Sequence, residues 1–252
     1  MLELDDVVVR FGGVLALDGP TFAVGEREIC GLIGPNGAGK TTLFNCVSRL
    51  YTPQSGSIRF EGQELLGRRP DQIAGLGIAR TFQNLALVPG LTVRENVMVG
   101  AHHRGRTGFV SAALALPGAR SEERELSEEA DGFLERLDLL DVADRPTAGL
   151  PYGTLKRIEL ARALCQRPRL LMLDEPASGL THAEVQELGD VITGLRDELG
   201  LAVLLVEHHM GMVMRISDRV VVLDFGRKIA EGPPTEMQHD QAVIDAYLGA
   251  EE

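Results

Sequence analysis

The sequence lacks any long apolar run. Its longest one covers residues 201–206, far fewer than the roughly 20 apolar residues that a membrane-spanning helix needs. The N-terminus also lacks a basic stretch followed by an apolar one, which marks a secretory signal peptide. Both absences argue against membrane insertion and export, so we expect a protein of the cytoplasm.

Cysteine is scarce. The three cysteines, Cys30, Cys46 and Cys165, stand alone within apolar patterns, and none has a neighbour at metal-ligand spacing. Such thiols are more often buried and reduced than joined in a disulfide or bound to zinc. We therefore expect three buried free cysteines.

Basic residues are outnumbered by acidic ones, 25 against 37, and the formal net charge is −12. Wide contact with nucleic acid or with an anionic membrane surface requires a positive surface, so neither contact is expected. The partners of such a chain are expected to be proteins.

Glycine is concentrated in a loop directly after the apolar run 29–33, which reads as a buried strand. The loop fits the pattern Gly-x4-Gly-Lys-Thr. We call its residues the phosphate loop: Gly34, Pro35, Asn36, Gly37, Ala38, Gly39, Lys40, Thr41 and Thr42. The glycines let consecutive N–H groups turn toward an anion, and the helix that follows, expected from Thr42 to residue 50, adds the positive end of its dipole. The loop predicts nucleotide binding, with Lys40 on the phosphates and the Thr41 hydroxyl on Mg²⁺.

Two carboxylates follow a second buried strand. Residues 170–173 are all apolar, and Asp174 and Glu175 come directly after them. Paired acids at the end of a buried strand are unfavourable unless a cation or ligand uses them, and α/β sheets bind ligands at this edge. We expect Asp174 to hold Mg²⁺ and Glu175 to polarise an attacking water.

Three other side chains at strand ends are ambiguous by themselves. Phe11 precedes a Gly-Gly turn and suits either the core or a nucleotide base; taken alone, it favours the core. Gln83 ends the strand expected over residues 77–83 and reads as an exposed glutamine. His208 follows the strand at residues 202–206, where it suits either a γ-phosphate or the surface.

The middle of the chain is helical in pattern. Thr92 and Glu95 form a capping-box signature, so a helix is expected to start near Val93. A long charged helix is expected over residues 121–140, with an apolar face at Leu126, Ala130, Phe133, Leu134 and Leu137. Another helix, over residues 155–166, follows the segment 150–154. The pattern predicts a helical insertion.

Taken together and in this order, these motifs resemble the ATPase subunit of ABC transporters across nearly the whole chain. The resemblance implies an α/β fold: a P-loop NTPase core of RecA-like type with an antiparallel β portion and an inserted helical subdomain. It implies a single domain over residues 1–250. Residues 1–91 and 151–250 would form the nucleotide-binding core, and residues 92–150 the insertion.

The resemblance also assigns roles and cofactors. Phe11 is expected to stack on adenine, and Gln83 to act in catalysis, to touch Mg²⁺ and to sense the membrane subunits. Tyr152 and Gly153 lie in the segment that matches the signature motif and are expected to contact nucleotide, and His208 matches the histidine that contacts the γ-phosphate. The cofactors are ATP and Mg²⁺, with metal contacts from Thr41, Gln83 and Asp174 and catalytic roles for Glu175, His208 and Gln83.

The fine pattern is similar to the branch that serves importers of branched-chain amino acids and of related amides or urea. The matching segments are residues 11–13, 80–84, 152–153, 230–232 and 247–249 and the long insertion. This branch implies an ATP-hydrolysing subunit at the cytoplasmic face of the membrane. It pairs with membrane-spanning permease subunits, with a second ABC ATPase subunit, identical or related, and indirectly with a solute-binding protein.

Two positions depart from the family pattern. The usual signature of the family is Leu-Ser-Gly-Gly-Gln. This chain has Pro151 where the serine is usual, so a hydroxyl and a backbone N–H are missing. Thr181 stands where an aspartate is usual. We expect a pair of nucleotide sites in which this subunit offers its partner a modified signature.

Two other function classes remain to be compared. A soluble ABC-type ATPase, for instance one of iron–sulfur cluster assembly, shares all of these motifs. A small-molecule kinase or GTPase shares only the phosphate loop, and the chain has no Asn-Lys-x-Asp run for reading guanine.

Overall fold

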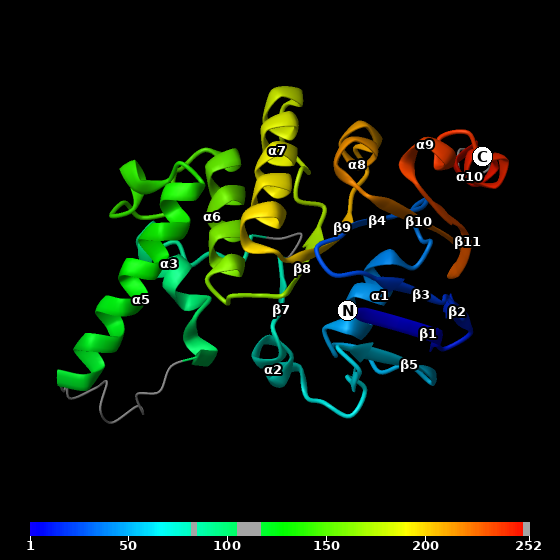
Figure 1. Cartoon of the computed structure of the whole chain (residues 1–252), viewed down its shortest axis with the longest axis horizontal. Helices are drawn as coiled ribbons and strands as arrows, with labels where there is room; N and C mark the ends of the chain where they lie inside the picture. Colours follow the sequence, from blue (N-terminus) through cyan, green and yellow to red (C-terminus); the bar gives the residue numbers. More distant parts are fainter. Residues whose placement is uncertain (82–84, 105–116, 249–252) are drawn as a thin grey trace.

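The computed structural model describes residues 1–81, 85–104 and 117–248 and contains two β-sheets with helices around them (Figure 1). The first sheet is antiparallel and contains β1 (Leu2–Phe11), β2 (Val14–Asp18), β3 (Phe22–Val24), β5 (Ser55–Phe60) and β6 (Gln63–Glu64). The second contains β4 (Ile29–Ile33), β7 (Ile78–Arg80), β8 (Leu170–Asp174), β9 (Ala202–Val206), β10 (Arg219–Asp224) and β11 (Arg227–Gly232).

In the described part of the chain, the helices with more than one turn are α1 (Lys40–Val47), α3 (Val93–Val99), α5 (Pro117–Arg136), α6 (Tyr152–Leu164), α7 (His182–Leu199), α8 (Met210–Ile216) and α10 (Gln241–Leu248). Two shorter helices are α2 (Pro70–Ile73) and α9 (Pro234–Met237). Within the described ranges, no helix combines the length and apolar character needed to cross a membrane.

The second sheet has the order β11-β10-β4-β9-β8-β7, and its five strands from β10 to β7 are parallel. All five residues of β4, β8 and β9 are buried, because both faces of this sheet are covered. Val206 at the end of β9 pairs with Leu32 of β4 and with Asp174 of β8. The segments that follow β4, β8 and β9 therefore start side by side at one edge.

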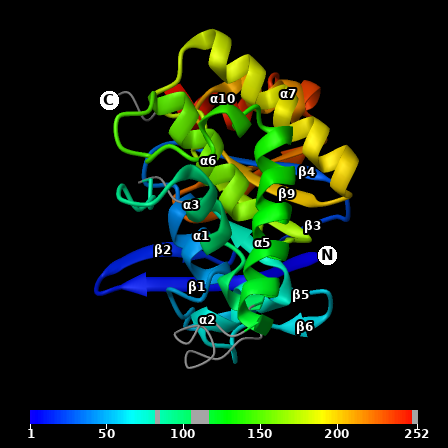
Figure 2. The ribbon, with the colours of Figure 1, turned by 90° about the vertical axis from the view of Figure 1, so that its left-hand side faces the viewer.

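Two cores lie on the two faces of this sheet. Alternate residues of β4 show the division: Ile29 and Ile33 pack with α7 and α8, whereas Cys30 and Leu32 pack with α1 and the antiparallel sheet. Figure 2 shows α7 and the antiparallel sheet on opposite sides of β4 and β9. The second sheet thus separates the two hydrophobic cores and contributes side chains to both.

The antiparallel β portion and the two-residue alternation of β1 are confirmed, with β1 paired to β2, β3 and β5. The sequence pattern did not identify β2, which turns back from β1 through Gly12 and Gly13. Its five residues hold a single fully buried side chain, Leu17, so the apolar alternation is too weak to mark a strand.

Helices α3, α5 and α6 pack on one another at one end of the molecule (Figure 1). The apolar face expected for α5 is confirmed, since Ala130, Leu134 and Leu137 are buried in the core. The expected bounds were wrong: α5 begins at Pro117, a residue suited to the first helical position, and ends at Arg136. It ends early because Asp138, with φ 55°, turns into the left-handed region. The division of the chain into a core and an inserted subdomain remains a prediction.

The cysteine prediction is confirmed. Cys30, Cys46 and Cys165 are all free and buried. Burial raises the pKa of Cys30 to about 12 and the pKa of Cys46 and Cys165 to about 11. At neutral pH these thiols stay protonated and act as small apolar side chains.

The predicted capping box starts α3 as expected. The Thr92 hydroxyl accepts a hydrogen bond from the backbone N–H of Glu95 at 3.2 Å, and the Glu95 carboxylate accepts one from the Thr92 N–H at 2.7 Å. The two residues satisfy each other's unpaired groups at the helix start.

Thr92→Ala is expected to lower the free energy of unfolding by roughly 0.5–2 kcal/mol, because it removes the N-cap acceptor. Urea unfolding followed by circular dichroism measures the change. Thr193→Ala in the middle of α7 is the matched control, since the Thr193 hydroxyl only bonds back to the Gly189 carbonyl. Equal losses in the two variants would contradict the capping role.

Candidate functional site

The phosphate loop connects β4 to α1 and depends on its glycines. Gly34 and Gly39 have φ angles of 150° and 101°. A Cβ at Gly34 would lie 2.1 Å from the Leu223 carbonyl oxygen, and one at Gly39 would lie 2.6 Å from the Ala16 carbonyl oxygen. The helix begins at Lys40, two residues earlier than expected, so Thr41 and Thr42 lie in its first turn.

Lys40 lies across the phosphate loop. Its side chain is buried, and Nζ donates hydrogen bonds to the carbonyl oxygens of Gly34 at 2.6 Å and Pro35 at 2.9 Å. Burial lowers the pKa of Lys40, whereas the nearby carboxylates of Glu175 and Asp174 act in the opposite direction. The structure thus brings the predicted phosphate-binding lysine close to both predicted acids.

Asp174 at the end of β8 is almost completely buried, with 2 % of its surface exposed. Its Oδ2 accepts a hydrogen bond from Arg80 Nη2 at 2.8 Å, and its buried Oδ1 has no hydrogen-bond partner among the residues that the structure describes. Burial raises the pKa of Asp174, and the Arg80 guanidinium lowers it in part. An unpartnered carboxylate oxygen beside a phosphate loop suits Mg²⁺, which prefers hard oxygen ligands.

Arg80 was not identified from the sequence. It lies at the end of β7, and its Nη1 donates to Asn45 Oδ1 at 2.8 Å and to Ser48 Oγ at 3.2 Å on the α1 side. The guanidinium also lies over the Phe44 ring, 5.4 Å from its centroid. Arg80 therefore links Asp174 to α1, the helix that begins with Lys40. In the sequence, the only sign of this role was a charged residue at the end of a strand.

Glu175 and His208 meet, although 33 positions separate them. His208 Nε2 donates a hydrogen bond to Glu175 Oε1 at 2.8 Å. The backbone N–H of Glu175 donates to the Val206 carbonyl at 2.8 Å. With φ 50°, Glu175 occupies a conformation that is unfavourable for a residue with a side chain. The two predicted catalytic side chains are thus brought together, although their roles stay predictions.

The signature segment starts α6, with Pro151 at the N-cap and Tyr152 and Gly153 in the first turn. The Tyr152 ring packs on the backbone of Gly179, where an added Cβ would come within 2.9 Å of the ring. The Lys156 ammonium lies 5.7 Å from the ring centroid. These contacts connect the signature segment to the loop after Glu175, not to this chain's own phosphate loop.

The remaining predicted site residues have different outcomes. Phe11 at the end of β1 is exposed rather than in the core, and its ring meets the Tyr51 ring edge-on at 5.1 Å. Its stacking on adenine stays a prediction. Thr181 is the N-cap of α7 and accepts a hydrogen bond from the Glu184 N–H at 3.4 Å. Gln83 lies outside the described residues.

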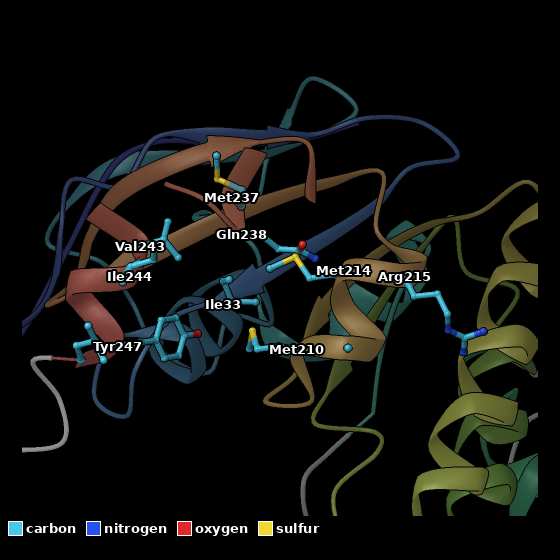
Figure 3. Close-up of a pocket in the computed structure, with 11 residues that line it drawn as sticks. Ile33, Met210, Met214, Arg215, Met237, Gln238, Val243, Ile244 and Tyr247 are labelled. Atoms are coloured by element: carbon cyan, nitrogen blue, oxygen red, sulfur yellow. The ribbon is translucent and has the colours of Figure 1, made fainter. Parts of the chain in front are cut away.

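A contact from α10 to the phosphate loop was missed by the sequence pattern. The Tyr247 hydroxyl accepts a hydrogen bond from the backbone N–H of Gly34 at 2.9 Å. Burial raises the pKa of Tyr247, so the phenol stays protonated at neutral pH. Tyr247 lines an apolar groove together with Ile33, Met210, Met214, Met237 and Val243 (Figure 3). Both backbone polar groups of Gly34 are thus hydrogen-bonded, the N–H to Tyr247 and the carbonyl oxygen to Lys40.

Comparisons with known proteins agree with this geometry. A family model described as ABC transporter matches residues 17–178, and one described as branched-chain amino acid ATP-binding cassette transporter matches residues 227–252. The chain is 43% identical over 249 residues to the high-affinity branched-chain amino acid transport ATP-binding protein BraF of Pseudomonas aeruginosa. It is 42% identical over 249 residues to LivG of Escherichia coli. Both matches cover 99% of this chain and 98% of the relative.

Solved structures are similar over nearly the whole chain. One is the ADP conformation of an ATP-binding cassette of an ABC transporter, with a TM-score of 0.86, 29% identity, and 99% and 98% of the two chains covered. Another is a nucleotide-free cassette from an ABC transporter, with a TM-score of 0.85, 29% identity and 98% of each chain covered. The predicted fold class is thereby confirmed.

Tyr247→Phe is expected to weaken ATP binding roughly two- to tenfold, since the net value of a hydrogen bond is about 0.5–1.5 kcal/mol. The dissociation constant of a fluorescent ATP analogue measures the effect. Ile244→Ala on the same helix is the control, because it removes apolar contact from the groove but leaves the Gly34 contact intact. Equal affinities of wild type and Tyr247→Phe would show that the contact does not support the loop.

Proposed function

Because the chain belongs to the ABC transporter family and to its ATP-binding subunits, we propose that it hydrolyses ATP to power import of branched-chain amino acids or related small amides. The observation that carries the proposal is the Glu175–His208 pair, which lies at the sheet edge that also carries Lys40 and Asp174. The import of branched-chain amino acids follows from the names of relatives that match over almost their whole length.

The residues divide the work of binding. Lys40 lies where its ammonium group can bind the β- and γ-phosphates, together with the N–H groups of the phosphate loop. We propose that Mg²⁺ would be held by three side chains: Asp174 through its buried Oδ1, Thr41 through its hydroxyl, and Gln83. Bound Mg²⁺ supplies charge neutralisation at the phosphate oxygens. Phe11 is proposed to stack on adenine, since its ring is exposed at the end of β1.

Hydrolysis requires a base for the attacking water. Glu175 is proposed for this role, because its carboxylate is partly exposed and accepts a hydrogen bond from His208. His208, whose side chain is 43% exposed, is proposed to hold the γ-phosphate. The hydrogen bond between His208 and Glu175 keeps the two groups next to each other.

The signature segment is proposed to serve the nucleotide of a second ATPase subunit. In this chain the Tyr152 ring lies against Gly179 in the loop after Glu175, and the Glu184 carboxylate of α7 lies beside Gly153. Pro151 offers no serine hydroxyl there, so the segment would bind a partner's phosphate through Gly153 and the first-turn N–H groups of α6. Closing of the two subunits would then drive the permease subunits at the cytoplasmic face of the membrane, with a solute-binding protein delivering the cargo.

A soluble ABC-type ATPase of cluster assembly is not favoured. BraF of Pseudomonas aeruginosa and LivG of Escherichia coli, which match over nearly the whole chain, are transport proteins by name.

Glu175→Gln is expected to leave ATP binding intact and to lower turnover by about 10²–10⁴-fold, because a positioned base contributes this much. Phosphate release by the assembled complex and binding of a fluorescent ATP analogue measure the two effects. Glu198→Gln, at an exposed glutamate paired with Arg136 on the surface, is the control. Near-normal phosphate release from Glu175→Gln would remove Glu175 from this role.

The transport assignment is tested by purifying the tagged chain from gently solubilised native membranes with ATP and identifying the co-purifying proteins by mass spectrometry. We expect two polytopic membrane proteins, a second ATPase subunit and a solute-binding protein. The tagged chain purified after detergent disruption of the complex is the control. Recovery of soluble assembly factors alone would contradict the transport assignment.

A further inference from the structure

Glu207 is a buried carboxylate directly beside the proposed site. It follows β9 and is 1% exposed. Its Oε1 accepts a hydrogen bond from the backbone N–H of Ala177 at 2.6 Å. Its Oε2 accepts from the N–H of His208 at 2.9 Å and of His209 at 3.2 Å. One side chain thus joins the segment after β8 to the segment after β9.

These contacts need two oxygen acceptors. All three recorded partners are N–H donors, so each carboxylate oxygen receives at least one hydrogen bond. An apolar side chain of the same size would leave the buried N–H of Ala177 and the partly buried N–H groups of His208 and His209 without this acceptor. Burying a carboxylate is itself unfavourable unless its oxygens are hydrogen-bonded. Packing alone therefore does not account for glutamate at this position.

The Glu207 side chain contacts the backbone next to each of the two residues that form the Glu175–His208 hydrogen bond. Ala177 comes two residues after Glu175, and the His208 N–H belongs to the residue whose ring meets Glu175. Glu175 itself has φ 50°, a conformation that persists only where the surroundings hold it. Its N–H bond to Val206 fixes one side of Glu175, and the Ala177–Glu207 bond fixes the other.

We propose that Glu207 is a positioning residue for ATP hydrolysis, which holds the backbones of Ala177 and His208 so that the Glu175 carboxylate and the His208 ring stay aligned. Because its side chain is buried, it acts through these two neighbours. The inference rests on the proposed function, because it gives Glu207 a role only if Glu175 and His208 act on ATP.

The decisive variant is Glu207→Gln, which keeps the size of the side chain but replaces one acceptor oxygen with an NH₂ group. At least one of the three N–H groups then faces a donor. We expect kcat for ATP hydrolysis to fall by about tenfold to 10²-fold, since small misplacements of catalytic groups have effects of this size. KM for ATP should change by less than about threefold, because the phosphate loop is untouched.

Glu28→Gln is the matched control. Glu28 precedes β4, at the opposite end of the strand from the phosphate loop, and its carboxylate accepts a hydrogen bond from the Gly25 N–H and pairs with Arg219. The variant Glu28→Gln therefore removes the same charge and the same kind of backbone contact, but far from the site. We expect lowered thermal stability with kcat unchanged.

A double-mutant cycle with His208→Ala separates positioning from general destabilisation. If Glu207 acts through His208 and Glu175, adding Glu207→Gln to His208→Ala should lower kcat by a smaller factor than adding it to the wild type, because only the alignment of Glu175 is then left to lose. A purely structural role predicts that the two effects multiply. Glu207→Asp, which keeps the charge but is one CH₂ shorter, is the second variant should Glu207→Gln fail to fold. We expect it to lose the Ala177 contact and to lower kcat as well.

The outcomes separate this inference from the proposed function. Failure of the wild-type complex to hydrolyse ATP would overturn both. Normal hydrolysis by Glu175→Gln would overturn the roles of Glu175 and Glu207 but leave ATP hydrolysis by the protein standing. If wild type hydrolyses ATP and Glu175→Gln does not, then a kcat for Glu207→Gln within about threefold of wild type, or multiplicative effects in the cycle, would overturn the role of Glu207 alone.

Discussion

The parallel pairing of β4, β9 and β8 is the constraint on which the rest of the structure depends. Val206 lies in register with Leu32 on one side and with Asp174 on the other. Three strands from distant parts of the chain therefore end at one level, and the side chains that follow them meet there. A shift of one residue in either pairing would turn Asp174 toward the other face of the sheet. The apolar side chains of the two cores hold this register.

Charge at this edge is balanced by a few buried contacts. Lys40 and Arg80 are cations at this edge, and Asp174, Glu175 and Glu207 are acids there. The Arg80–Asp174 pair has side chains 9% and 2% exposed, so neither charge is well solvated. Removing one partner of such a pair is strongly destabilising, on the order of 3–5 kcal/mol, because the other stays buried and unpaired. The ion pair is therefore one that the fold cannot easily lose.

The sequence predicted the elements whose signals are local. Continuous apolar runs identified β4, β8 and β9, and the phosphate loop and the capping box at Thr92 have fixed spacing. Arg80, Glu207 and Tyr247 were missed because their partners are 94, 30 and 213 positions away in the chain. No pattern within one segment records such a contact. The start of α5 was missed for a different reason: a proline ends many helices but also suits a first helical position.

The contact between Gly34 and Tyr247 has a consequence for how the protein is made. Ribosomes deliver Gly34 early, but the acceptor for its N–H is 213 positions further along. The strands that pair with β4, which are β9 and β10, also come late. During synthesis β4 therefore has no strand to pair with until β9 and β10 are made. Its apolar side chains and unpaired backbone stay exposed until about residue 224 has left the ribosome. Such long-range pairing slows folding and exposes the nascent chain to aggregation, so this protein has reason to engage chaperones before it first binds nucleotide.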